Sequence, residues 1–281
     1  MKIKKIAALK YFRAKFKILS RISARKAAEE AFKLFCTPLE KSTKPLPPVF
    51  TFAEPLHFQL NGLKVTGFRW NKGKPVKILI LHGFSSSSKN FHHYVLPLME
   101  KGYEVLAFDA PAHGNSEGKT VNAVEYSQMI TNIINLYGPV NGFIAHSFGG
   151  IALSLSLENT MQDENTKVVL IAPATETATA IDSAFTILQI KNKKVRTEFD
   201  HIIFEKSGHP TEWFSIKRAM QNIKAAVLWI HDEDDDVTPL TDAIKIKELN
   251  LSNIRFIITK GLGHRRIYRD EKIKNEVVNF L

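Results

Sequence analysis

Short apolar runs recur along the chain from about residue 57, and segments with helically spaced apolar positions separate them. The first two runs meet at Asn61-Gly62, a dipeptide that favours a tight turn between antiparallel strands. Later runs, such as residues 76–81, are apolar at nearly every position, as in strands that are buried on both faces. This pattern predicts an initial hairpin followed by buried strands.

The alternation of the two patterns places the elements along the chain. Strands are expected at residues 57–60, 63–70, 76–81, 105–108, 142–145, 168–171, 226–230 and 254–258. Helices are expected near residues 88–101, 121–136, 149–158, 239–248 and 267–280. Strands that alternate with helices after a hairpin predict an α/β fold, with a mostly parallel sheet and helices on both faces.

The alternation stops at about residues 175–223, where no clear strand is present. Apolar residues recur there at helical spacing, namely Phe185, Leu188, Ile190, Phe199, Ile203, Phe204, Trp213 and Phe214. An insert of this length is more often a small folded element than a structureless loop. We therefore expect a small helical lid.

The N-terminal 44 residues carry 13 Lys and Arg against three Glu, whereas the other 237 residues are nearly neutral. Residues 1–36 lack Gly and Pro and are expected to be helical, and residues 41–48, with three prolines, form a linker. We predict a basic arm and linker at residues 1–44 and a main domain at residues 45–281. The arm could form a broad apolar face from Ile6, Leu9, Phe12, Phe16 and Leu19, although lysines fall nearly all round the helix.

Two roles are open for the arm: a solvated helix packed on the domain, or attachment to an anionic membrane surface through residues 1–36. Nucleic acid is not an expected partner, because no recognition module accompanies the charge. Lys10 and Arg13 interrupt any apolar core of a signal peptide. The single cysteine, Cys36, and the lack of a long apolar run lead us to expect a cytoplasmic protein. In the second of the two roles, the arm would contact the inner face of the membrane.

Three short segments offer a serine, a carboxylate and a histidine, each after a predicted buried strand. A serine hydroxyl becomes a good nucleophile when a histidine takes its proton and a carboxylate holds that histidine. Ser147 follows the strand at 142–145, and a sharp turn there needs small neighbours, which Ala145 and Gly149 supply. In isolation this pentapeptide also fits a buried serine without a role. The backbone amides of Phe84 and Phe148 are the natural pair of oxyanion donors.

The motifs LHGF, FDAPAHGNS, AHSFGG, IHDEDDDVTP and GLGH, in this order, resemble those of the α/β-hydrolase superfamily over about residues 56–281. The resemblance implies the α/β-hydrolase fold with an eight-stranded sheet, no cofactor, and a Ser-His-Asp triad that acts on esters. By motif position Ser147 matches the nucleophile, His264 the base, and Phe84 and Phe148 the oxyanion residues. Alanine stands at positions 145 and 112 where the superfamily pattern has glycine, although some of its lipases also carry alanine at the first position.

The acid lies within five consecutive acidic residues, 232–236. The superfamily pattern, which places its aspartate four residues before the proline, selects Asp235, with Asp234 and Asp236 as alternatives. A calcium loop is excluded because Val237 and Ala243 stand where it needs glycine and glutamate, and we expect no metal. The other carboxylates are expected to form a solvated cluster, and Thr238 and Pro239 to cap and start the next helix.

These residues predict a carboxylesterase-like serine hydrolase whose substrate is a small-molecule ester with an apolar acyl or aryl group. His146, beside the nucleophile, and Phe185 and Leu188, in the insert, are expected to contact the substrate. The alternatives are a thioesterase, a lysophospholipase or monoacylglycerol-lipase-like enzyme at a membrane surface, and a non-catalytic binding protein with the same fold.

Overall fold

The computed structural model describes residues 2–38 and 45–281 and divides the chain into two compact units. The helical unit consists of the described part of Met1–Thr37 together with Glu176–Ser215, and the sheet unit of Pro38–Thr175 and Ile216–Leu281. The arm and most of the insert, which are far apart in the sequence, thus belong to one unit. Of the predicted linker, residues 41–44 lie outside the described residues, and Pro48 begins a short 3-10 helix, η1 (Pro48–Phe52).

One eight-stranded sheet forms the centre of the sheet unit, with the strand order β1-β2-β4-β3-β5-β6-β7-β8. Its strands are β1 (Glu54–Leu60), β2 (Leu63–Trp70), β3 (Lys77–Leu81), β4 (Glu104–Phe108), β5 (Gly142–His146), β6 (Lys167–Ile171), β7 (Ala226–Asp232) and β8 (Ile254–Thr259). β2 pairs antiparallel with both β1 and β4, and all other pairs are parallel. The predicted α/β-hydrolase fold is therefore confirmed, including the hairpin at Asn61 and Gly62, both of which have positive φ.

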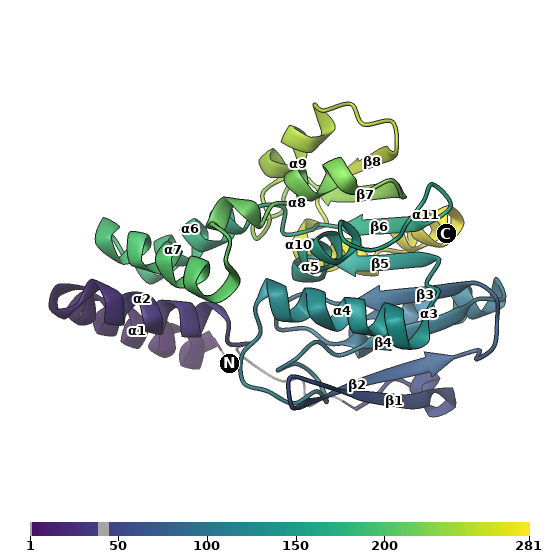
Figure 1. Ribbon diagram of the computed structural model, residues 1–281, viewed down its shortest axis with the longest axis horizontal. Coiled ribbons are helices and arrows are strands. Elements are labelled where there is room, and N and C mark those ends of the chain that lie inside the picture. The colour runs from purple at the N-terminus through teal and green to yellow at the C-terminus, as the bar shows by residue number, and fades with distance from the viewer. Residues whose placement is uncertain (1, 39–44) are drawn as a thin grey trace. The chain divides into compact units, whose positions relative to one another are not determined.

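Helices cover both faces of this sheet (Figure 1), with α3 and α11 on one face and α4 and α5 on the other. The helices of the sheet unit are α3 (His92–Glu100), α4 (Ala123–Tyr137), α5 (Phe148–Leu157), α8 (Ile216–Ala219), α9 (Leu240–Lys247), α10 (Gly263–Arg266) and α11 (Glu271–Phe280), with short 3-10 turns at Ser88–Phe91 (η2), Met220–Asn222 (η4) and Ile267–Arg269 (η5). α4 begins with a capping box, in which Asn122 and Glu125 bond each other's amides. Ile78 and Ile80 of β3 belong to one core cluster with Tyr94 of α3 and Val277 of α11, and the alternate residues Leu79 and Leu81 are also fully buried, so β3 is apolar on both faces.

Four helices and a 3-10 turn build the helical unit: α1 (Lys2–Ile22), α2 (Ala24–Phe35), α6 (Thr177–Leu188), α7 (Lys193–Ser207) and η3 (Thr211–Trp213). Ser23 separates α1 from α2, and its hydroxyl accepts the Lys26 amide as an N-cap. The ring of Phe199 on α7 lies 5.6 Å from that of Phe32 and 5.4 Å from that of Phe185. The insert thus contains helices, as its apolar spacing predicts.

The predicted apolar face of the arm is only partly right. Phe16 is 1% exposed, and Leu9, Phe12 and Leu19 are half-buried, but Ile6 is exposed. None of the helices within residues 2–38 and 45–281 has the length and apolar content needed to cross a membrane.

Candidate active site

Ser147 lies at a sharp turn between β5 and α5, with φ 53° and ψ −120°. A positive φ is strained for a residue with a side chain, and strained residues cluster at functional sites. The turn brings α5 so close to the end of β3 that a Cβ on Gly149 would lie 2.8 Å from the carbonyl oxygen of His82. Glycine is therefore required at position 149, whereas the methyl group of Ala145 is fully buried within β5.

A continuous hydrogen-bonded chain joins Ser147, His264 and Asp235. The Ser147 hydroxyl lies 3.0 Å from Nε2 of His264, and Nδ1 of the same ring lies 2.8 Å from Oδ2 of Asp235. All three residues are at least nine-tenths buried. Of the alternative acids, Asp234 is exposed and accepts the Gly261 amide, and Asp236 is also exposed. The structure thus places Asp235 against the imidazole.

Hydrogen bonds determine the charge of Asp235. Burial alone would raise its pKa, but the bond from His264 and the amides of Thr238 and Val237, each 2.8 Å from Oδ1, hold the pKa below its ordinary value. The carboxylate is therefore ionised and accepts the Nδ1 proton of His264. That tautomer leaves Nε2 of His264 free of a proton, and Nε2 can accept the proton of Ser147.

The turn after β3 provides the second half of the site. A Cβ on Gly83 would lie 2.9 Å from Cβ of Ser147, so only glycine allows this close approach. Phe84 follows directly, and its ring lies 5.5 Å from that of Phe148, the first residue of α5. Within the described part of the chain neither backbone amide donates to an acceptor, which leaves both able to bind an oxyanion.

Two buried histidines hold this turn. Nδ1 of His82 donates to the Gly83 carbonyl at 2.8 Å and its Nε2 accepts the Ala110 amide, while Nε2 of His113 accepts the Ser85 amide at 2.9 Å. Burial lowers the pKa of His82 to about 4, so the ring is neutral and can accept as well as donate. Both rings therefore fix the backbone that presents the Phe84 amide.

Comparison with known proteins identifies the superfamily. The family model described as serine aminopeptidase, S33, matches residues 74–206. Putative esterase/lipase 2 of Mycoplasma pneumoniae is 24% identical over 229 residues, which are 69% of this chain and 84% of that protein. The chain belongs to the α/β-hydrolase superfamily. It is an α/β-fold serine hydrolase of the esterase/lipase type.

Further likenesses agree with this assignment. The lysophosphatidylserine lipase ABHD12 of Danio rerio is 27% identical over 231 residues, 73% of this chain but only 57% of that longer protein. The esterase Pf2001 of Pyrococcus furiosus has the same fold, with a TM-score of 0.65, 18% identity, and coverage of 88% of this chain and 97% of that one.

The acidic run of this hydrolase is only partly the solvated cluster that its sequence predicts. Asp232, the last residue of β7, is fully buried, and only Glu233, Asp234 and Asp236 are exposed. Oδ1 of Asp232 accepts the amides of Gly263 and Asp234 at 2.8 and 3.0 Å, and Oδ2 accepts the Leu262 amide and the Thr259 hydroxyl. Asp232 thus clamps the loop that carries His264.

Although burial would raise the pKa of Asp232, the hydrogen bonds from Thr259, Gly263 and Leu262 lower it, so this carboxylate is ionised. One feature of the sequence does indicate that Asp232 is buried: it comes directly at the end of an apolar strand of the core. Three of its partners, however, lie 27 to 31 residues later, at Thr259, Leu262 and Gly263, and the sequence pattern does not reveal them.

Thr238 also has a role that differs from the prediction. α9 begins at Leu240 after Pro239, without a side-chain cap. The Thr238 hydroxyl instead lies 2.9 Å from Oδ2 of Asp235 and 3.2 Å from the Ala172 carbonyl oxygen. Since its backbone amide also bonds Asp235, Thr238 holds the acid from two sides.

His146 supports the loop that carries His264. Its Nε2 donates to the His264 carbonyl at 3.0 Å, and its ring centroid lies 4.7 Å from that of His264 and 4.5 Å from that of Tyr268. Burial lowers the pKa of His146 to about 3, so the ring is neutral. Its predicted contact with substrate stays a prediction.

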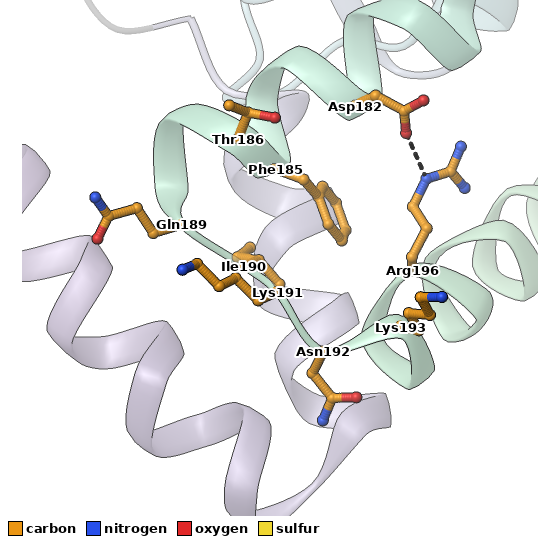
Figure 2. A pocket seen from close by; sticks show the side chains of 9 residues that line it. All are labelled: Asp182, Phe185, Thr186, Gln189, Ile190, Lys191, Asn192, Lys193 and Arg196. Atoms are coloured by element: carbon orange, nitrogen blue, oxygen red, sulfur yellow. Dashed lines mark hydrogen bonds and ion pairs between the residues drawn. The ribbon is translucent and has the colours of Figure 1, made fainter.

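Phe185 and Leu188 lie on α6 in the helical unit. Phe185 lines a pocket of about 370 Å³ there (Figure 2), whereas Leu188 is half-buried and not among its lining residues. Near Phe185, Nε of Arg196 lies 3.1 Å from Asp182. Contact of these two apolar residues with a substrate at Ser147 remains a prediction. Among the described residues, no group of three or more His, Cys, Asp or Glu is arranged to hold a metal.

Proposed function

We propose that this enzyme hydrolyses carboxylic esters with an apolar acyl or aryl group through a covalent acyl-enzyme on Ser147. The observation that carries the proposal is the hydrogen-bonded chain from the Ser147 hydroxyl through His264 to Asp235. A serine in this arrangement needs no cofactor to become a nucleophile.

The reaction has two halves. In the first, Oγ of Ser147 attacks the ester carbonyl carbon while Nε2 of His264 takes its proton, and the amides of Phe84 and Phe148 bind the oxyanion. The intermediate collapses when His264 returns the proton to the leaving alcohol, which leaves an ester on Ser147. In the second half, His264 takes a proton from water, whose oxygen attacks the acyl carbon. The bond from that carbon to Oγ of Ser147 then breaks, the carboxylic acid leaves, and the proton returned by His264 restores the Ser147 hydroxyl. Asp235 stays ionised throughout and stabilises the imidazolium.

An apolar acyl or aryl group fits the surroundings of Ser147. The rings of Phe84 and Phe148 flank the proposed oxyanion donors and contact each other edge to face, and both are half-buried. The ring of Tyr126 lies 5.4 Å from that of Phe148 and extends this aromatic wall. Such surfaces favour apolar groups over charged ones.

A lysophospholipase or monoacylglycerol-lipase-like activity at a membrane is the second candidate, and a thioesterase is a further alternative. The likeness to ABHD12, named a lysophosphatidylserine lipase, favours the lipase. A cytoplasmic location, with residues 1–36 as the membrane contact, belongs to this proposal. A non-catalytic binding protein is less supported, because it would have no need of an aligned serine, histidine and carboxylate.

A panel of p-nitrophenyl esters from acetyl to palmitoyl, assayed with wild type and Ser147→Ala, tests the function. Loss of turnover in the variant at every chain length is expected, because triad members act as a unit. Ser154→Ala is the matched control, since Ser154 is a buried serine of α5 whose hydroxyl donates to the Gly150 carbonyl of the same helix. Equal turnover in wild type and Ser147→Ala would refute the mechanism. An optimum at long acyl chains would favour the lipase.

A further inference from the structure

α1 has two apolar faces, and only one of them is buried. Phe16 and its helical neighbours face α2 and α6. On the opposite side, a second apolar row is open to solvent, and we call it the outer stripe: Ala7, Tyr11, Ala14, Ile18 and Ile22. Its members are three or four residues apart, which aligns them along one side of the helix. Tyr11, Ile18 and Ile22 are 63%, 61% and 71% exposed.

Basic residues border the outer stripe. Lys10, Lys17 and Arg21 lie along one edge, and all three are exposed. Throughout residues 2–38 and 45–281 no carboxylate lies within ion-pair distance of these three, whereas Lys15 on the other edge pairs with Glu30 at 2.7 Å. α1 contains no Asp or Glu. The edge at Lys10, Lys17 and Arg21 therefore carries positive charge that no carboxylate of the described residues neutralises.

We infer that the outer face of α1 docks the enzyme on an anionic membrane surface. The outer stripe would enter the boundary between headgroups and acyl chains, where Tyr is well placed, and the three cations would meet lipid phosphates. Long basic side chains can keep their charge among the headgroups while their aliphatic stems lie along the apolar boundary. This inference deepens the lipase candidate of the proposed function, which places a membrane contact in residues 1–36, by naming the face of α1 that makes the contact. Docking itself requires neither Ser147 nor a particular ester, so vesicle binding and turnover can fail separately.

Other occupants fit this face less well. A second copy of the chain would bring two helices without acidic residues together, and their like charges would repel. A nucleic acid would neutralise the cations but leave Tyr11, Ile18 and Ile22 without an apolar partner. An anionic lipid surface satisfies both the charge and the apolar row.

Cosedimentation of the full chain with vesicles tests the inference. Wild type is expected to bind phosphatidylglycerol–phosphatidylcholine vesicles, to bind pure phosphatidylcholine at least tenfold more weakly, and to lose binding as salt rises. The triple variant Lys10→Gln, Lys17→Gln, Arg21→Gln should bind about a hundredfold more weakly, at roughly fivefold for each basic residue near the surface. Ile18→Ser with Ile22→Ser should cost about tenfold or more, because their apolar burial is lost.

A matched control separates a docking face from diffuse charge. Lys217, Lys224 and Lys247 are exposed residues of the sheet unit, and their replacement by Gln removes the same net charge. This control should bind within about twofold of wild type, and equal weakening of both triple variants would overturn the inference. Circular dichroism and thermal unfolding check that each variant is folded, and Ser147→Ala should bind vesicles as wild type does, whatever its turnover.

The same measurements identify other occupants. Sedimentation velocity that shows a dimer, abolished by Ile18→Ser with Ile22→Ser, in a protein that does not bind vesicles would replace the membrane by a second copy. Binding to duplex DNA without binding to anionic vesicles would replace it by nucleic acid. Either result overturns the inference.

Discussion

Replacing Asp232 with asparagine removes one charge from the loop that carries His264 and leaves the volume of the side chain nearly unchanged. The carboxylate accepts three backbone amides and one hydroxyl. An asparagine that keeps its oxygen on the Gly263 and Asp234 amides turns its NH2 group toward the Leu262 amide and the Thr259 hydroxyl. The hydroxyl can rotate to accept, but the Leu262 amide then loses its acceptor.

The structure gives the size of the expected effect. Three hydrogen bonds lose the charge of the carboxylate, which costs about 1 kcal/mol for each. The Leu262 amide loses its partner, which costs about 1 kcal/mol or more. Because Leu262 is half-buried, water can recover part of this loss. We expect Asp232→Asn to lower the free energy of unfolding by about 3 kcal/mol. We expect kcat to fall about a hundredfold, because His264 directly follows Gly263 and a displacement of about 1 Å has that effect on a catalytic group.

Urea unfolding and ester kinetics would measure both effects in Asp232→Asn and in the control Asp234→Asn. Asp234 is exposed and accepts the Gly261 amide, so its replacement should change stability by less than about 0.5 kcal/mol. If the two variants agree within about 0.5 kcal/mol and about threefold in kcat, Asp232 does not clamp the loop.

Three further predictions concern the acid, the effect of pH and one turn. Asp235→Asn should lower kcat about ten-thousandfold, because an amide that donates to Nδ1 of His264 selects the wrong tautomer; a loss under tenfold in ester kinetics would contradict this. Stability should fall as the pH falls below about 6.5, because the unfolded chain then protonates His82 and His146 while their folded pKa values of about 4 and 3 keep them neutral. The loss should reach about 2 kcal/mol per histidine at pH 5, continue down to the folded pKa values, and be visible in urea unfolding at pH 7, 6 and 5, with a flat profile as the contradicting result. Ala112→Gly should stabilise the protein by about 0.5–1 kcal/mol, because Ala112 has φ 65°, which is strained for alanine. Ala110→Gly is the control and should destabilise the protein. If thermal unfolding shows the same sign for both variants, Ala112 is not strained.

Much of the sheet unit could be predicted from the sequence because its inner strands are buried on both faces. A continuous apolar run such as β3 is a strong local signal, and all eight predicted strands are present. Ser147 and Asp235 follow such strands directly, and the carboxyl ends of neighbouring parallel strands lie at one edge of the sheet.

The sequence could not show which partners a polar residue finds at a distance. Asp232 looked like a member of a solvated run because the amides that bury its charge belong to a loop some 30 residues later. Thr238 looked like a helix cap because Ala172, which its hydroxyl contacts, lies 66 positions away. In α1 lysines are spread around the helix, so the sequence pattern does not separate its two apolar faces. The packing of α1 against α2 and α6 shows which of them is exposed to solvent.

Mass spectrometry of the full chain after reaction with a fluorophosphonate tests the central claim most directly. This reagent labels a serine that a histidine activates, and the account predicts one adduct on the peptide that contains Ser147. The adduct should be absent in Ser147→Ala and form at least a hundredfold more slowly in His264→Ala. No adduct, or an adduct on another serine that persists in Ser147→Ala, would contradict the assignment of Ser147 as the nucleophile.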